Sequence, residues 1–496
     1  MSVKRNILAG WSAHLITVLI GFFLMPYVLG VLGDSRYGVW LFINAIAGYS
    51  GVIYAGFGAT ICRYVADTAS RKEWDRLNQF VSSIQGVYFG TASIVMLATI
   101  VLVLLAPMLD RWDDVPIRDV QFSMLIVGAS IALGMIASVY GGVLIGTQQL
   151  HYKRAIEVVC GVLRGGLTVL MLTQQWGLVT LASVFFAVTV VEHGLSALLA
   201  YRCVPTLSVS PRNIRRGVLR ECFGFSAFNA IAVAAEYLIY FTDTIVIGAI
   251  LGPAAIVPYQ IGLRIAQMIQ MPIAQMGEAI LPRAGQLAAE SDRKRLGRLV
   301  ARAMGVSALL AGGFFVGGLY FGDLLVVTWI GKSYPHTHAV MCLLLATQVI
   351  AMPMVIVRKA LLGSGEVRVP AFIDLLEAVA NLCLSLILIH FWGIVGVAVG
   401  TLLPLLIVES SILLPFAIRR LHISRNDLLH EVVYPVIPCL VALTVYCEVA
   451  SVMVPLQGWV TLLGVTAGGG AVLLATRLLM HLLNRPMTIA KQTLAT

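Results

Sequence analysis

Long apolar stretches constrain this chain more than any other feature of its sequence. Residues 6–33 contain no Asp, Glu, Lys or Arg, and similar blocks recur along all 496 residues. A helix of about 20 apolar residues is long enough to cross the hydrocarbon core of a bilayer. Only 12% of the residues are charged, against about 25% in ordinary soluble domains. The pattern therefore predicts an all-α membrane protein that crosses the bilayer many times.

About 14 apolar blocks meet this length criterion. They are centred roughly on residues 20, 49, 93, 132, 165, 189, 237, 268, 310, 350, 380, 405, 441 and 470. The first block is too long for the core of a signal peptide, so we expect it to be a retained helix. The connections are short and leave no room for a folded soluble domain. Any function must therefore reside in the membrane layer.

The basic residues indicate a topology. The chain carries a formal net charge of +10, and its cations gather in alternate connections, such as those that hold Arg71 and Lys72 or Arg293 and Lys294. Cytoplasmic loops of membrane proteins are enriched in Lys and Arg. We therefore expect both termini in the cytoplasm and no nucleic-acid partner. The 8 cysteines form no CxxC pair, so neither a zinc site nor a disulfide framework is indicated.

The chain also resembles itself at a constant offset. Gly33 and Gly252, both in predicted turns, are 219 residues apart, and so are Arg76 and Arg295. Duplication of a six-helix unit would give both halves the same orientation, as in transporters with parallel repeats. We therefore expect one six-helix lobe at residues 1–205, a second at 206–425, and two further helices with a cytoplasmic tail at 426–496.

Two neighbouring predicted helices carry polar residues along one face. The stripes consist of Ser226, Asn229, Glu236, Tyr240 and Asp243, and of Gln260, Arg264, Gln267, Gln275 and Glu278. Ionisable groups at membrane depth are costly and usually face a cavity or a partner. The stripes therefore predict a shared wet cavity. The Arg264 guanidinium could bind a phosphate or pyrophosphate there, or it could pair with Glu236 or Asp243 and only fix helix packing.

Three further polar residues are candidates for the lining of this cavity. His14 and Asn44 lie on the first two predicted helices, and Arg164 lies on the fifth. The long Arg164 side chain could bind substrate, but it could also reach the membrane surface or pair with Glu192.

A second polar cluster is predicted on the eleventh and twelfth helices. Asp374, Glu377 and Asn381 share one helical face, and Thr401 follows on the next helix. Oxygen ligands from several helices suit a hard cation, so the cluster could hold a transported Na⁺ or proton. The alternative is a hydrogen-bonded packing network near the inner surface, and Asp374 lies close to the cytoplasmic end. No tightly bound metal or organic cofactor is indicated.

Several short motifs lie in a fixed order along the chain. They are Tyr27–Gly33, Tyr37–Trp40, Gly56–Gly58, Arg63–Ala66, Thr242–Gly248, Leu251–Gly252, Tyr259 and Leu281–Pro282. Together they resemble the motifs of the Wzx-type polysaccharide flippases, and the resemblance covers nearly the whole chain. These flippases belong to the multidrug/oligosaccharidyl-lipid/polysaccharide (MOP) superfamily, which also includes the MurJ-like lipid II flippases. One departure is Tyr54, which stands where many relatives have an acidic residue.

The resemblance implies two six-helix lobes around a central cavity in the inner membrane of a bacterium. It further implies a substrate of undecaprenyl-pyrophosphate-linked oligosaccharide, moved to the periplasmic leaflet for O-antigen, exopolysaccharide or capsule assembly. Arg264 would contact the pyrophosphate or an anionic sugar, and a polymerase and a chain-length regulator would be partners. A sodium site like that of MurJ-like relatives would use Asp243, Glu377, Asn381 and Thr401, although the order of carboxylate and asparagine is reversed here.

Three other classes of function compete with this interpretation. A cation-coupled drug or metabolite exporter of the same superfamily would share the lobes and the acidic site. A membrane enzyme, such as a sugar-chain polymerase, would need a catalytic constellation, and His336 and His338 have no such neighbours beyond Asp323. A scaffold gives no reason to hold Asp243 and Arg264 at membrane depth. The sequence therefore favours a transporter over an enzyme.

Overall fold

The structure is a computed structural model in which the chain folds into helices. It describes residues 3–109, 111–112, 114–172, 177–215, 217, 234, 237–239, 241–454 and 457–493. The chain divides into two compact units, Met1–Val257 and Pro258–Thr496. Helix α8 (Ile256–Gln267) begins just before this division.

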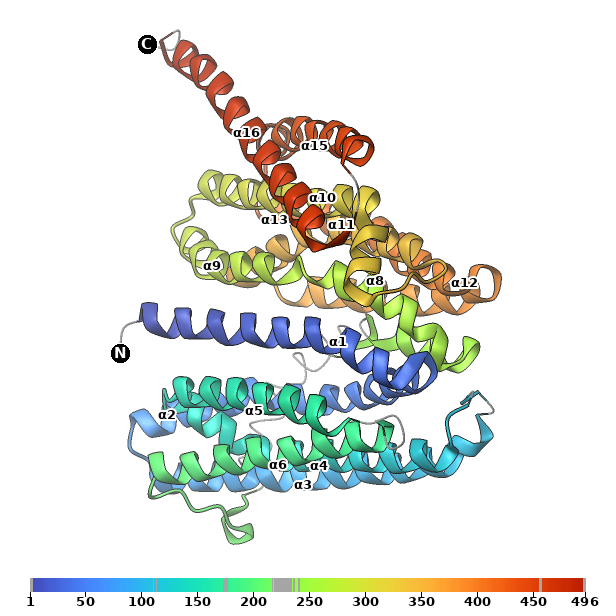
Figure 1. Ribbon diagram of the computed structural model, residues 1–496. Helices are drawn as coiled ribbons and strands as arrows, with labels where there is room; N and C mark the ends of the chain where they lie inside the picture. The colour runs from blue at the N-terminus through green and yellow to red at the C-terminus, as the bar shows by residue number, and fades with distance from the viewer. Residues whose placement is uncertain are drawn as a thin grey trace. The chain divides into compact units, whose positions relative to one another are not determined.

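The first unit is built on six helices. They are α1 (Val3–Gly48), α2 (Ser50–Ser70), α3 (Trp74–Leu105), α4 (Ile117–Gly146), α5 (Leu150–Met171) and α6 (Gly177–Cys203). Helix α4 packs against α2, α3 and α6, while α5 packs against α1 and α6. Figure 1 shows α3, α4 and α6 running side by side. The short turn η1 (Ala106–Met108) lies between α3 and α4, the turns η2 (Pro211–Asn213) and η3 (Pro253–Ala255) follow α6, and residues 241–251 are helical.

The second unit continues after α8 with further helices. They are α9 (Gln270–Ala289), α10 (Arg293–Ile330), α11 (Thr337–Gly363), α12 (Arg368–Val408), α13 (Leu414–Arg420), α14 (Arg425–Leu428), α15 (Tyr434–Met453) and α16 (Gly458–Thr493). Helix α11 packs against α9, α10 and α12, and α15 packs against α10 and α16. The break between α8 and α9 precedes Pro272, whose ring clashes with the carbonyl four residues earlier.

Two of the long helices are interrupted by a glycine. Gly33 inside α1 and Gly393 inside α12 have φ of 74° and 56°, a left-handed region that other residues rarely adopt. After Gly393 the chain folds back on itself, because the Cα of Gly396 lies against the Leu388 carbonyl and Gly400 lies against the Ser385 backbone. Helix α12 is therefore a hairpin of two antiparallel segments.

The hydropathy of the helices confirms a multi-pass membrane protein. Within the described residues, 9 helices are long and apolar enough to cross a bilayer, and one of these candidate spans is the whole α12 hairpin with its continuation, Arg368–Arg420. Large apolar side chains such as Leu97 and Leu104 on α3 are exposed, as expected for helices that face lipid. The total of 14 spans stays a prediction.

The internal repeat is visible in the turns. Lys72 and Ser291, which are 219 residues apart, both have φ of 58°. The backbone hydrogen bonds around them match, since Glu73 N–H donates to the Thr68 carbonyl and Asp292 N–H donates to the Leu287 carbonyl. Gly33 and Gly252 likewise both have positive φ. These equivalent turns support the duplication, while the predicted lobe boundaries stay a prediction.

The second unit contains two π-helical segments with a common cause. Segments η4 (Glu409–Leu413) and η5 (Leu429–Val433) each end two residues before a proline, Pro415 or Pro435. Proline has no N–H to donate to the carbonyl four residues earlier, so the helix widens there. Each segment carries a glutamate that pairs with an arginine of another helix: Glu409 with Arg358 and Glu431 with Arg302.

Candidate functional site

Arg358 is the centre of a charged cluster in the second unit. The cluster, called here the Arg358 cluster, consists of Arg358 on α11, Asp374 and Glu377 on α12, and Glu409 at the start of η4. Arg358 donates from Nε and Nη2 to Asp374 Oδ1, at 2.8 and 2.7 Å. Its Nη2 also lies 2.5 Å from Glu409 Oε1 and 3.7 Å from Glu377 Oε2. One guanidinium on α11 therefore joins two carboxylates of α12 and one of the π-helical segment.

The members of this cluster differ in their exposure to solvent. The side chains of Arg358 and Asp374 are 25% and 24% exposed, whereas those of Glu377 and Glu409 are 7% and 1% exposed. The Oε2 atoms of both glutamates are buried without a hydrogen-bond partner. The cluster thus has a partly solvated side and a buried side, and the buried side consists of two carboxyl groups.

The neighbouring polar residues of the α12 hairpin form a small network. The Ser385 hydroxyl lies 3.5 Å from Asn381 Oδ1 and 3.4 Å from the Val397 carbonyl, to which Thr401 also donates. The Ser385 hydroxyl and the Val397 carbonyl therefore connect Asn381 to Thr401 by hydrogen bonds. Of the predicted ion-coupling residues, Glu377, Asn381 and Thr401 belong to the second unit. Asp243 is buried in the first unit, so a joint site stays a prediction.

The first unit holds a second charged group of residues, called here the Glu192 cluster. Glu192 on α6 accepts from Lys153 Nζ at 3.0 Å and lies 3.9 Å from Arg164 Nη2, both on α5. The Arg164 guanidinium also stacks 4.7 Å from the centre of the Phe185 ring. Arg164 thus has the structural partner that the sequence offered as an alternative, and its Nε is still buried without an acceptor.

The other predicted cavity residues are placed as follows. Arg264 on α8 is exposed, and no ion pair with a carboxylate is found for it in the described part of the chain. Gln260 and Gln267 on the same helix are half-buried. Asn44 donates to the Trp40 carbonyl one turn back in α1, at 2.7 Å. Glu236 and the side chain of His14 lie outside the described residues. The shared cavity stays a prediction, since its residues come from both units.

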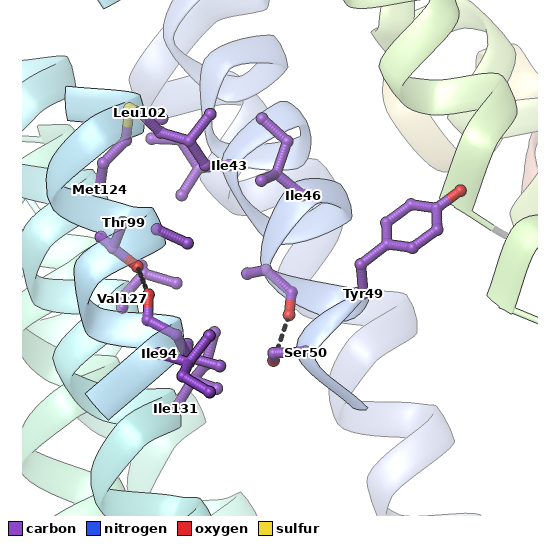
Figure 2. A pocket seen from close by; sticks show the side chains of 14 residues that line it. Ile43, Ile46, Tyr49, Ser50, Ile94, Thr99, Leu102, Met124, Val127 and Ile131 are labelled. Carbon is purple, nitrogen blue, oxygen red and sulfur yellow. Dashed lines mark hydrogen bonds between the residues drawn. The ribbon is translucent and has the colours of Figure 1, made fainter. Parts of the chain in front are cut away.

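An apolar cavity of about 310 Å³ lies between α1, α3 and α4 in the first unit. Figure 2 shows aliphatic side chains from all three helices around it, including Ile43, Ile94 and Val127. Tyr49 lies at its edge, and its hydroxyl is hydrogen-bonded to Thr242. The cavity offers space for an apolar group but few polar contacts that could select one.

Sequence reasoning missed two members of the Arg358 cluster. Arg358 precedes Lys359 at the end of an apolar block and therefore resembles a loop cation, and Glu409 had no assigned partner. Lys359 does pair with a neighbour, Glu278 on α9, at 2.5 Å. A possible signal was the presence of a carboxylate, Glu409, deep in the last apolar block before Arg419, which requires a cationic partner.

Comparison with known proteins agrees with the family resemblance that the sequence motifs indicated. A model of the family described as "Polysaccharide biosynthesis protein" matches residues 3–288, and the MatE family model matches residues 229–387. "Uncharacterized membrane protein EpsK" of Bacillus subtilis is 21% identical over 94% of this chain and 93% of its own length. The "Putative O-antigen transporter" of Shigella flexneri is 20% identical over 81% of this chain and 94% of its own.

A solved structure shares the fold over nearly its whole length. Lipid II flippase MurJ, in an inward closed conformation, aligns with a TM-score of 0.74 at 10% identity, covering 96% of this chain and 99% of its own. The two family models, together with this fold, define a multi-pass α-helical transporter of the MOP superfamily. Because the family model covers more than half of its length, the chain belongs to the polysaccharide biosynthesis protein family. Two of these three relatives are named as an O-antigen transporter and a lipid II flippase, which agrees with the prediction of a transporter rather than an enzyme.

Proposed function

We propose that this protein is a flippase for undecaprenyl-pyrophosphate-linked oligosaccharides. It would move them from the cytoplasmic to the periplasmic leaflet of a bacterial inner membrane for the assembly of surface polysaccharide. The observation that carries the proposal is the combination of family membership with a fold that matches a lipid II flippase from end to end. Both termini would lie in the cytoplasm, as the distribution of Lys and Arg suggests.

The chemistry of the substrate suggests roles for the polar residues of α8. A pyrophosphate is best bound by a guanidinium, which can donate two parallel hydrogen bonds to it. Arg264 is exposed and keeps its donors available for an anion, while Gln260 and Gln267 on the same helix could contact the sugars. His14, Asn44, Glu236 and Arg164 would complete the cavity lining from the first unit. Translocation would proceed by alternating access.

The export of the substrate would be driven by an ion. Asp243, Glu377, Asn381 and Thr401 are the residues proposed to take part in coupling to Na⁺ or H⁺. Support comes from the burial of Asp243, Glu377 and Asn381, since polar groups at membrane depth mark ion pathways. A polysaccharide polymerase and a chain-length regulator would receive the product.

The experiment is depletion of the protein from its native cell. We expect lipid-linked oligosaccharide to accumulate on the cytoplasmic leaflet and surface polysaccharide to be lost, because the proposed flipping is the step that exposes the sugar to the periplasm. Wild type should restore both, whereas Arg264→Ala should restore neither. Arg283→Ala is a matched control, since that arginine is held by Gln286 one turn away on α9. Unchanged lipid intermediates in depleted cells would contradict the proposal.

A second candidate function is cation-coupled export of a drug or metabolite. It is favoured by the match of the MatE family model to residues 229–387. An exporter would leave the lipid intermediates unchanged in depleted cells and would raise the sensitivity of those cells to cationic toxins. The same depletion strain therefore separates the two functions.

A further inference from the structure

The formal charges of the Arg358 cluster do not balance. One guanidinium faces three carboxylates, so complete ionisation would leave two surplus negative charges. Asp374 accepts two bonds from the guanidinium on the partly solvated side. The surplus therefore falls on Glu377 and Glu409, the two most buried members. A buried carboxylate without its own counter-charge is costly in any environment and more so in a membrane.

The contact between the two glutamates shows how this cost can be avoided. Glu377 Oε2 and Glu409 Oε1 lie 3.7 and 2.5 Å from the same nitrogen, Arg358 Nη2, so the two carboxyl groups are close neighbours. Two ionised carboxylates are both acceptors, so a bond between them exists only when one carries a proton. If both were ionised, the Oε2 atom of each would remain buried with no partner. Two close carboxylates generally share one proton for this reason.

We propose that Glu377 and Glu409 form a binding site for one exchangeable proton. In the binding step a hydronium ion transfers its proton to one carboxylate and leaves as water. The resulting carboxylic acid then donates a hydrogen bond to the other carboxylate. The proton exchanges through the side of the cluster where Arg358 and Asp374 are partly exposed.

A proton fits this site better than a metal cation. Arg358 Nη2 already lies 2.5 Å from Glu409 Oε1 and 3.7 Å from Glu377 Oε2, and its positive charge would repel a second cation at the same place. A hard cation also needs about six oxygen ligands. In the part of the chain that the structure describes, no group of three His, Cys, Asp or Glu residues is arranged to hold a metal ion.

The position of the site suggests what the proton does. The charged groups that face Glu409 are Arg358 from α11 and Asp374 and Glu377 from α12. A bound proton removes one negative charge and so weakens the attraction that holds η4 to α11. η4 is a π-helical segment, and such segments are frequent at functional sites. The role of this switch in coupling rests on the proposed flippase function, but the proton site itself does not.

The test measures the proton directly in the purified full-length protein. Infrared spectra of the protein in lipid nanodiscs are recorded as the pH is raised, and the C=O stretching band of a protonated carboxylic acid is followed. We expect the wild type to lose such a band with rising pH, and Glu377→Gln and Glu409→Gln each to lack this pH-dependent component. Glu192→Gln is the matched control, because that glutamate accepts from Lys153 in the first unit, and it should leave the band unchanged.

Each other outcome overturns the proposal in a different way. A wild type without a pH-dependent acid band would show that the cluster is a fixed, fully ionised structural contact. A band that falls when Na⁺ is added at constant pH would show a sodium site instead. Glu409→Asp serves as a second variant, since it keeps the carboxyl group and should retain the band. The spectra need no substrate, so failure of the flippase proposal would leave this result unaffected.

Discussion

The carboxylates of the Arg358 cluster and those of the Glu192 cluster lie on corresponding helices of the two units, but the two clusters differ in their charge balance. At the 219-residue offset, α5 and α6 of the first unit correspond to the two arms of the α12 hairpin and its continuation. In the Glu192 cluster two cations, Lys153 and Arg164, meet the half-buried Glu192, and Glu157 lies 3.7 Å from Lys153, so that two positive charges face two negative ones. In the Arg358 cluster one cation meets three carboxylates.

This difference separates a structural contact from a site that can change its charge. Lys153 and Arg164 can both satisfy Glu192, so the loss of one leaves the other in place. Glu377 and Glu409 depend on the same nitrogen of a single arginine. A duplicated scaffold has therefore kept a balanced ion pair in one unit and a carboxylate-rich cluster in the other.

The largest expected effect follows from removal of the shared arginine. Arg358→Ala should lower the free energy of unfolding by about 3–5 kcal/mol, because it strands buried carboxylates. Arg164→Ala is the matched change in the first unit and should cost less than about 1 kcal/mol, since its side chain is 37% exposed and Lys153 remains. Chemical unfolding in mild detergent measures both, and equal losses would erase the distinction between the clusters.

A second substitution restores part of the charge balance in the Arg358 cluster. Adding Glu409→Gln to Arg358→Ala should recover about 1–3 kcal/mol of the lost stability. The second substitution removes the negative charge of a buried carboxylate whose cationic partner, Arg358, is already gone. The four proteins of this double-mutant cycle are compared by the same unfolding measurement. Strictly additive losses would indicate that Glu409 does not depend on Arg358.

A smaller effect distinguishes the units at two equivalent glycines, Gly177 and Gly396. An added Cβ on Gly396 would lie 2.2 Å from the Leu388 carbonyl oxygen, which is backbone of the same hairpin, whereas on Gly177 it would meet only the end of the Leu32 side chain. Gly396→Ala should therefore cost about 1–3 kcal/mol and Gly177→Ala less than about 1 kcal/mol. Thermal melting in detergent tests which substitution lowers stability more. A larger loss of stability for Gly177→Ala than for Gly396→Ala would contradict the prediction.

Much of the fold could be predicted from local sequence, because the long helices are encoded by apolar blocks and some of the reversals by a glycine. The turns at Gly33 and Gly252 are examples, since both glycines adopt the positive φ that their sequence positions suggested. The polar face of Asp374, Glu377 and Asn381 could be read from the helical period alone.

The Arg358 cluster could not be predicted in the same way. Its central contact joins Arg358 to Glu409, which lies 51 residues further along the chain, and no periodic pattern connects them. The π-helical segment that positions Glu409 arises from Pro415, six residues later, and alters the register that a regular helix would give. This part of the site therefore depends on packing between helices, which the local sequence pattern does not reveal.

The most direct test of the account is a flipping assay with the purified protein. Vesicles are reconstituted with undecaprenyl-pyrophosphate-linked oligosaccharide extracted from depleted cells, and the fraction of sugar exposed to an external glycan-modifying enzyme is followed after one leaflet is modified. The account predicts that wild-type protein renews the exposed pool and that Arg264→Ala does not. An exposed pool that is renewed no faster than in protein-free vesicles, with folded wild-type protein present, would contradict it.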